Sequence, residues 1–312
     1  MNADLISRDR LVNTVLAVVG PTCSGKTSLS IKLARILDGE VIASDSRNIY
    51  KFMDIGTAKP TIEEREGIVH HMIDVAEPDE TYTVAQYKKE AQKAFDKIFQ
   101  KGRLPVVCGG TGLYTRALLE GLAIPEAAPD EDFRKRLNSL ADEKGDEHLH
   151  ELLQKKDPVA AQKISIRDRF RIIRALEVID QLNIPFSQAA EIKPPPFQVI
   201  WIGLNYKDRS LLKENISERL AIQIKDGLEA EVRSLYERYG KTRTLLNAVT
   251  YKQFINYFEN LISYDEAIEE CIKHNYQLAR KQIMWFRKNP RINWLYVDCD
   301  NDLETRALEE IA

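Results

Sequence analysis

A glycine-rich run near the N-terminus contains the residues whose chemistry is easiest to infer. Gly20, Gly25, Lys26 and Thr27 are spaced as Gly-x-x-x-x-Gly-Lys-Thr, between an apolar run and a helical pattern. In such a P-loop, backbone N–H groups surround phosphate oxygens, the lysine adds a point charge, and the threonine hydroxyl ligates Mg²⁺. The pattern does not distinguish ATP from another diphosphate. We predict Mg²⁺ as the cofactor, Thr27 as its ligand, and phosphate contacts from Gly20, Thr22, Ser24, Gly25, Lys26, Thr27 and Ser28.

Two polar residues follow other apolar runs. Asp45 comes after Val41–Ala43, where a carboxylate could hold Mg²⁺ through water, act as a general base, or cap a helix. Thr111 lies in the run Gly-Gly-Thr-Gly at 109–112, after Val106–Cys108. These glycines allow close approach of a ligand to the backbone, or they form an ordinary strand-to-helix turn.

A parallel sheet would bring these residues together. Four apolar runs have the composition of buried strands, at 14–19, 40–43, 104–108 and 197–204. Helical spacing of apolar residues separates the first three, at 28–37 and 84–99. This alternation predicts an α/β fold with a doubly wound parallel sheet, whose ligand site lies at the carboxyl ends of the strands.

The chain changes character after about Gly121. Residues 121–196 are charged and amphipathic, contain no convincing strand, and end in three consecutive prolines. With 312 residues, the chain is long for one domain. We therefore predict a P-loop core formed by 1–120 and 197–312, with 121–196 as an inserted all-helical domain.

Cysteine and histidine patterns give no metal site. The four cysteines are scattered, and without an export signal they are interpreted as reduced thiols. His70 and His71 are adjacent, so on a strand they point to opposite faces and are interpreted as structural. No apolar segment approaches membrane-spanning length. We expect a soluble, cytoplasmic protein with no membrane partner, and a monomer.

Local basic stripes favour binding of nucleic acid. The net charge of −3 creates no global attraction to a polyanion. Arg167, Arg171 and Arg174 fall on one helix face, and paired basic residues recur every seven positions in the C-terminal region, including Arg280, Lys281 and Arg287. Such stripes suit a phosphate backbone, although exposed helix faces are usually charged in any case.

Several longer motifs occur in a fixed order. They are the P-loop, Asp45-Ser46 with Tyr50, Asp54 to Pro60, His70 to Asp74, Gly109 to Tyr114, Arg171 to Glu177, Gly227 to Val232, and Ala279 to Arg287. Together these motifs resemble the tRNA dimethylallyltransferase (tRNA isopentenyltransferase) family. The resemblance extends from about residue 14 to 297, and the run from Asp54 to Pro60 is far more specific than the P-loop.

The resemblance implies transfer of a dimethylallyl group from dimethylallyl diphosphate to the exocyclic amine of the adenosine 3′ of the anticodon. Asp45 would be the base, Thr111 and Arg219 would lie at the donor's diphosphate, and the P-loop would grip that diphosphate. The insertion would clamp the anticodon stem-loop of tRNA. The implied tRNA contacts are Asp45, Ser46, Arg47, Asn48, Arg171, Arg174, Arg280, Lys281 and Arg287.

Three alternatives remain open from the sequence. An isopentenyltransferase could use the same donor with a free adenine nucleotide, although a mononucleotide needs neither the insertion nor the basic stripe. A P-loop small-molecule kinase would use ATP. A diverged paralogue could bind tRNA without modifying it, because some positions depart from the family pattern: Arg47-Asn48, Phe170, Asn215, and Thr250, which stands where glycine is usual before the tyrosine.

Overall fold

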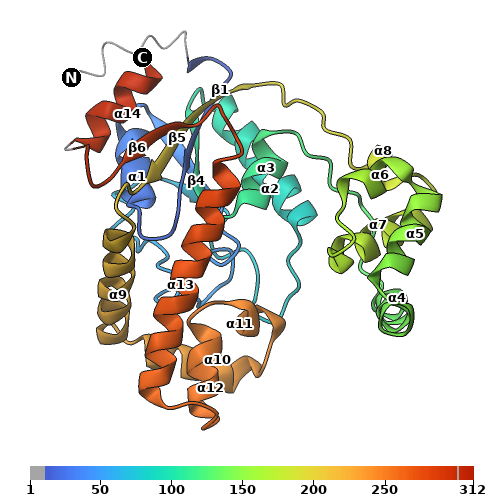
Figure 1. The fold of residues 1–312 in the computed structure, drawn as a ribbon. Helices are drawn as coiled ribbons and strands as arrows, with labels where there is room; N and C mark the ends of the chain where they lie inside the picture. The colour runs from blue at the N-terminus through green and yellow to red at the C-terminus, as the bar shows by residue number, and fades with distance from the viewer. Residues whose placement is uncertain (1–10, 301) are drawn as a thin grey trace. The chain divides into compact units, whose positions relative to one another are not determined.

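The computed structural model describes residues 11–300 and 302–312. Its sheet has six parallel strands in the order β3-β2-β4-β1-β5-β6 (Figure 1). The strands are β1 (Thr14–Val19), β2 (Gly39–Ala43), β3 (His70–His71), β4 (Leu104–Gly109), β5 (Gln198–Asn205) and β6 (Asn293–Tyr296). The predicted α/β fold with a parallel sheet is confirmed.

Helices cover both faces of the sheet. On one face, α1 (Lys26–Ile36) and α14 (Leu303–Ile311) pack on a core that includes Leu16, Val18 and Val106. Helix α2 (Val84–Gln100) packs against β2 and β4 and lies on the other side in Figure 1, near α3 (Gly112–Leu119). Strands β1 and β4 are buried along their whole length, which explains their continuous apolar composition.

Five helices lie between β5 and β6 in the chain. They are α9 (Arg209–Lys225), α10 (Leu228–Tyr239), α11 (Arg243–Asn247), α12 (Tyr251–Phe258) and α13 (Tyr264–Phe286). The long α13 begins with a capping box between Ser263 and Glu266 and packs against α9 and α12 (Figure 1). Its buried residues, among them Ala279 and Ile283, recur at helical spacing, so one stripe faces the core and the opposite side is exposed.

Residues Leu119–Pro195 form a separate compact unit. The unit contains α4 (Glu131–Lys144), α5 (Asp146–Lys156), α6 (Pro158–Lys163), α7 (Arg169–Leu182) and α8 (Phe186–Ala189). It has its own core around Leu149, Leu153 and Ile172. The sequence had suggested 121–196 for the inserted domain. Within the described part of the chain, no helix is both long and apolar enough to cross a membrane.

Candidate active site

The carboxyl ends of β1, β2 and β4 meet at one edge of the sheet. Ser44 N–H donates to Cys108 O at 2.7 Å, and Thr111 N–H donates to Ser44 O at 3.1 Å, so the segments after β2 and β4 run side by side. A cavity of about 580 Å³ opens at this edge. It is lined by the P-loop from Thr22 to Ser28, the segment from Asp45 to Asn48, Gly56–Ala58, Thr111, Arg219, the segment from Asn247 to Val249, Tyr251, Leu278 and Gln282, among others.

The P-loop leads directly into α1. Gly25 has φ +77°, a conformation that side chains rarely tolerate, and it caps a helix that begins at Lys26. The helix starts two residues before the predicted 28, because the apolar periodicity used for prediction becomes visible only at Leu29. The first N–H groups of α1 therefore belong to the phosphate-binding motif itself. The Lys26 ammonium folds over the loop and donates to Pro21 O at 3.2 Å.

Arg219 reaches the P-loop from α9. Its Nη1 donates to Thr22 Oγ1 at 2.7 Å, and its buried Nε has no hydrogen-bond partner within the described residues. One turn earlier, Asn215 Nδ2 donates to the Tyr206 hydroxyl, which itself donates to Cys23 O at 2.5 Å. Asn215, one of the unusual positions, thus supports the P-loop backbone. A guanidinium with an unsatisfied N–H beside this loop favours an anionic ligand.

The segment after β2 brings the other predicted polar residues into the cavity. Asp45 Oδ1 accepts from Arg47 N–H at 2.8 Å, so this carboxylate also caps its own turn. Thr111 Oγ1 accepts from Ser46 N–H at 2.9 Å. Arg47 Nη2 donates to Asn247 O, and the buried Asn48 Oδ1 has no partner within the described residues. Acid, amide and hydroxyl groups therefore line one wall beside the P-loop.

The glycines of the 109–112 run are explained by close approach of the protein itself. A Cβ at Gly109 would lie 2.1 Å from Ser44 O, one at Gly110 would lie 2.2 Å from Gln282 Nε2, and one at Gly112 would lie 2.1 Å from the Trp285 ring. The sequence left open whether these glycines admit a ligand or form a turn. The structure shows that they let Ser44, just after β2, and α13 pack against the turn, while Gly109 and Thr111 still line the cavity.

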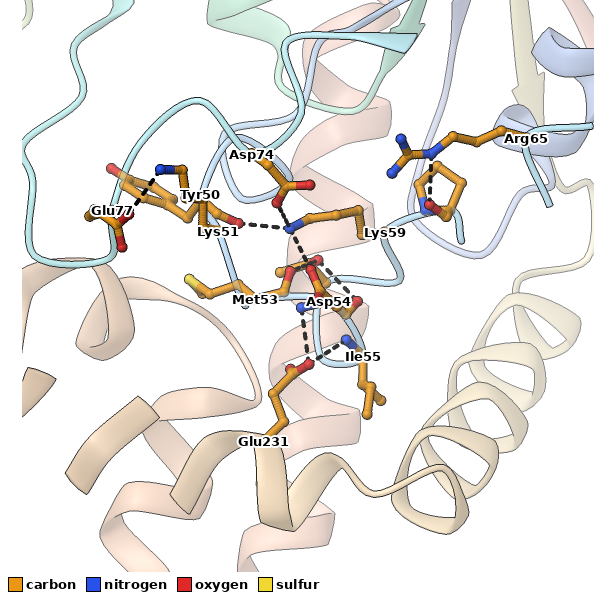
Figure 2. A network of polar contacts seen from close by, with 12 residues as sticks. Tyr50, Lys51, Met53, Asp54, Ile55, Lys59, Arg65, Asp74, Glu77 and Glu231 are labelled. Atoms are coloured by element: carbon orange, nitrogen blue, oxygen red, sulfur yellow. Dashed lines mark hydrogen bonds and ion pairs between the residues drawn. The ribbon is translucent and has the colours of Figure 1, made fainter. Parts of the chain in front are cut away.

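The run from Asp54 to Pro60 forms another wall and is fixed by two charged side chains (Figure 2). Glu231 accepts from Asp54, Ile55 and Gly56 N–H at 3.0, 2.7 and 3.0 Å. Lys59, which is 8% exposed, donates to Tyr50 O and to the carboxylates of Asp54 and Asp74 at 2.5 to 2.7 Å. Both charged side chains bind groups of the protein itself. The distinctive sequence of this run is therefore explained by its role in forming the cavity wall.

Comparisons with known proteins agree with this geometry. The model of the family described as IPP transferase matches residues 48–289. A curated "tRNA dimethylallyltransferase" from Carboxydothermus hydrogenoformans is 42% identical over 283 residues, 90% of this chain and 91% of the relative. This chain belongs to the IPP transferase family. The resemblance inferred from the motifs is thereby confirmed.

Solved structures support the same assignment. A tRNA isopentenylpyrophosphate transferase from Bacillus halodurans matches with a TM-score of 0.71 at 34% identity, covering 96% of this chain and 94% of that one. A eukaryotic dimethylallyltransferase, described as acting on tRNA, matches with a TM-score of 0.78 at 25% identity, covering 95% and 78%. The IPP transferase fold therefore extends over both compact units of the chain.

The basic residues predicted to contact RNA differ, in this IPP transferase, in whether their side chains are exposed and whether they already form ion pairs. Arg280 and Lys281 on α13, and Arg287 at its C-terminal cap, are exposed and have no ion-pair partner within the described residues. Arg171 is exposed and lies 3.4 Å from Asp168. Arg174, by contrast, pairs with the buried Glu177 at 2.5 Å and donates to two backbone carbonyls. Sequence spacing identified the helix face, but it could not show that Arg174 is already engaged.

The residues at the phosphate site fit a magnesium ion that shares its ligands with a substrate. Thr27 and Asp45 both line the cavity. Among the described residues no group of three acidic, histidine or cysteine side chains could hold a metal by itself. Mg²⁺ is commonly bound by one or two protein oxygens together with substrate phosphates and water. The predicted ligand Thr27 is therefore compatible with a diphosphate-dependent ion.

Three residues that shape the site were not singled out from the sequence. Glu231 and Lys59 fix the wall formed by the run from Asp54, and Gln282 contacts the P-loop from α13. Each lies inside a motif that carried the family resemblance. Sequence alone gave no reason to choose these members of the motifs. Glu231 and Gln282 bind backbone groups far away along the chain, and Lys59 binds carboxylates that only the folded loop brings around it.

Proposed function

We propose that this chain transfers a dimethylallyl group from dimethylallyl diphosphate to the exocyclic amine of the adenosine 3′ of the anticodon in tRNA, releasing diphosphate. The observation that carries the proposal is the convergence of Lys26, Arg219 and Asp45 on one cavity in a member of the IPP transferase family. Two cations can hold a diphosphate, and a carboxylate on the adjoining wall can accept a proton. We further propose that it works in the cytoplasm, as a monomer.

The donor's diphosphate would lie against the P-loop and Arg219. The N-terminus of α1 and the Lys26 ammonium offer positive charge, and the unsatisfied Arg219 Nε–H would donate to a phosphate oxygen. As the carbon–oxygen bond of the allylic diphosphate breaks, negative charge accumulates on the leaving group. Groups already aimed at that charge stabilise the transition state more than the ground state.

Magnesium would be held by the Thr27 hydroxyl together with diphosphate oxygens. When bound, it would supply further neutralisation of the leaving group's charge. The residues of the chain supply the remaining positive charge and fix the orientation of the donor. The Thr111 hydroxyl accepts a hydrogen bond from Ser46 N–H. It would therefore keep the segment from Asp45 to Asn48, where the acceptor would bind, next to the diphosphate.

The acceptor amine would enter beside Asp45. The carboxylate accepts the proton that the amine loses as its nitrogen attacks the allylic carbon. Asn48 Oδ1, buried and without a partner within the described residues, would accept the amine's other N–H. The adenosine must leave the base stack to reach this wall. Contacts to RNA phosphates would come from Arg171 on α7, from Arg280 and Lys281 on α13, and from Arg287 at the C-terminal cap of α13.

Transfer of label from radiolabelled dimethylallyl diphosphate tests the proposal. Parallel reactions with Mg²⁺ would contain tRNA lacking the modification, an anticodon stem-loop with adenosines after the anticodon, or free AMP. Label in the two RNAs and none in AMP is expected. Label in AMP alone would identify a nucleotide isopentenyltransferase. Phosphoryl transfer from labelled ATP, with no prenyl transfer, would identify a kinase, and binding of tRNA with no transfer would identify a diverged paralogue.

A further inference from the structure

Thr22, the third residue of the P-loop, is held from two sides by helices that are remote in sequence. Its Oγ1 accepts from Arg219 Nη1 on α9 at 2.7 Å. Its backbone N–H donates to Gln282 Oε1 on α13 at 2.8 Å. The amide of Gln282 thus occupies an N–H group of the loop that could otherwise bind a phosphate oxygen. That N–H serves to fix the position of Thr22.

Gln282 is itself tightly placed. Its Nε2 packs against Gly110, where a Cβ would approach to 2.2 Å, and Trp285, one turn further along α13, packs against Gly112 in the same way. The amide therefore lies between the P-loop and the turn after β4, and it lines the cavity. A side chain wedged between two loops of the phosphate site has little freedom to move.

The hydrogen bond from Arg219 also determines that the Thr22 hydroxyl can act as a donor toward a ligand. Because its oxygen accepts from Arg219, the hydroxyl proton is available to a second acceptor. Thr22 and Arg219 both line the cavity, and Arg219 Nε–H is unsatisfied within the described residues. An anionic oxygen in the cavity would accept from both groups at once.

We propose that Gln282 is a positioning residue for the donor's diphosphate: it fixes Thr22 so that the Thr22 hydroxyl and Arg219 together grip a phosphate oxygen. This inference rests on the proposed function only in the identity of the ligand, a diphosphate ester. Gln282 itself does not contact the reacting atoms. Its effect reaches them through Thr22 and Arg219.

Binding of Mg²⁺-pyrophosphate to the full chain, followed by calorimetry, tests the inference. Gln282→Met removes the acceptor for Thr22 N–H at similar side-chain volume, and Gln282→Asn keeps an amide that is one methylene too short. Each should weaken pyrophosphate binding about tenfold, the usual effect of losing one hydrogen bond near a charged ligand. Gln277→Met, at an exposed glutamine of the same helix, should leave binding unchanged.

A double-mutant cycle distinguishes positioning from a general structural effect. Thr22→Ala removes the hydroxyl but keeps the N–H that Gln282 holds, and it should also weaken binding about tenfold. If Gln282 acts through that hydroxyl, adding Gln282→Met to Thr22→Ala should cause no further loss. Losses that multiply, or unchanged affinity in both Gln282 variants, would overturn the inference. A wild-type chain that does not bind Mg²⁺-pyrophosphate would overturn the proposed donor site instead.

Discussion

The Tyr251 hydroxyl donates a 2.6 Å hydrogen bond to Glu231 Oε1, the same carboxylate oxygen that accepts from Gly56 N–H. The Tyr251 ring also packs directly beneath Gly56, where any Cβ would approach it within 2.6 to 2.8 Å. Burial, followed by the charge of Glu231, raises the pKa of Tyr251 well above its ordinary value, so the hydroxyl stays protonated as a donor. One carboxylate thus joins α10, α12 and the cavity wall.

Glu231→Gln should loosen that wall. An amide offers one acceptor oxygen where the carboxylate uses two, so at least one of the N–H groups of 54–56 loses its partner. We expect a loss of about 2 kcal/mol in unfolding free energy and a clear drop in transfer to tRNA. Denaturant unfolding and the label-transfer assay measure these. Glu229→Gln, which removes only a surface pair with Arg233 on the same helix, should change neither, and equal effects in both variants would contradict the role of Glu231.

Thr250 adopts φ +83°, ψ −54° while fully buried, an uncommon conformation for a β-branched residue. Glycine and alanine substitutions both remove its hydroxyl, which accepts from Asn275 Nδ2, but only glycine relieves the backbone strain. Thr250→Gly should therefore be more stable than Thr250→Ala by about 1 kcal/mol, the reverse of the usual order. Thermal unfolding of the two variants compares them directly. A more stable alanine variant would show that no strain is stored there.

The fold was largely predictable because most of its strands are continuous apolar runs that can be recognised in the sequence. The run Thr14–Val19 is apolar on both faces, as a central parallel strand must be, and it leads straight into a P-loop whose chemistry fixes its place at the sheet edge. The two-residue strand β3 had no such signal. Its pairing with β2 depends on contacts such as His71 to Glu40, which only the folded chain brings together.

The site was predictable as a set of residues and not as a set of contacts. The P-loop and Asp45 follow strands, so topology alone placed them at one edge. Arg219 came only from the family resemblance, because nothing in the pattern of α9 separates it from other basic residues there. The partners Gln282 and Glu231 were missed, since a side chain that binds backbone N–H groups from a distant segment leaves no periodic trace in the sequence.

Asp45→Asn should separate proton transfer from turn formation. The asparagine Oδ1 can still accept from Arg47 N–H, as Asp45 Oδ1 does at 2.8 Å, so the segment should keep its shape. The amide cannot take up the amine's proton, and kcat should fall by about 10²- to 10³-fold with pyrophosphate affinity nearly unchanged. Single-turnover transfer and calorimetry measure the two quantities. Near-normal turnover would rule out Asp45 as the base.

The exposed cations of α13 should act through RNA phosphates. Arg280→Gln and Lys281→Gln should each weaken stem-loop binding, and each should lower the slope of log affinity against log salt by about 1. Filter binding across a salt series gives both values. Glu270→Gln, on the same helix but acidic, should not lower the slope.

Arg174→Met should behave differently from those surface substitutions. Arg174 neutralises Glu177, which is fully buried and also holds Arg134 and Asp130 N–H. Removing it should destabilise the helical unit by about 2 kcal/mol. A loss of RNA binding in this variant should follow the fraction of that unit unfolded, measured by hydrogen exchange on α7. Weakened binding with unchanged exchange would make Arg174 a direct RNA contact.

Glu40 should make stability depend on pH in the acid range. Its carboxylate is fully buried beneath Lys101, Arg103 and His71. Burial alone would raise its pKa, but the hydrogen bonds from these three side chains outweigh burial and lower the pKa from 4.5 to about 2. The unfolded chain therefore binds a proton more readily than the folded one. The resulting stabilisation, about 3 kcal/mol, is present above pH 4.5 and is lost as the pH falls toward 2.

Glu40→Gln should flatten this dependence. An amide has no charge to lose. Unfolding free energies measured in urea between pH 5 and 3 should therefore fall less steeply with decreasing pH in the variant than in the wild type. Near pH 3, the variant should take up about one proton fewer than the wild type on unfolding. The variant should also be less stable at neutral pH, because Lys101 and Arg103 lose their shared acceptor. Glu309→Gln, which removes a surface pair with Arg306, serves as the control and should keep the wild-type slope. If both variants keep that slope, the acid sensitivity of the fold originates in carboxylates other than Glu40.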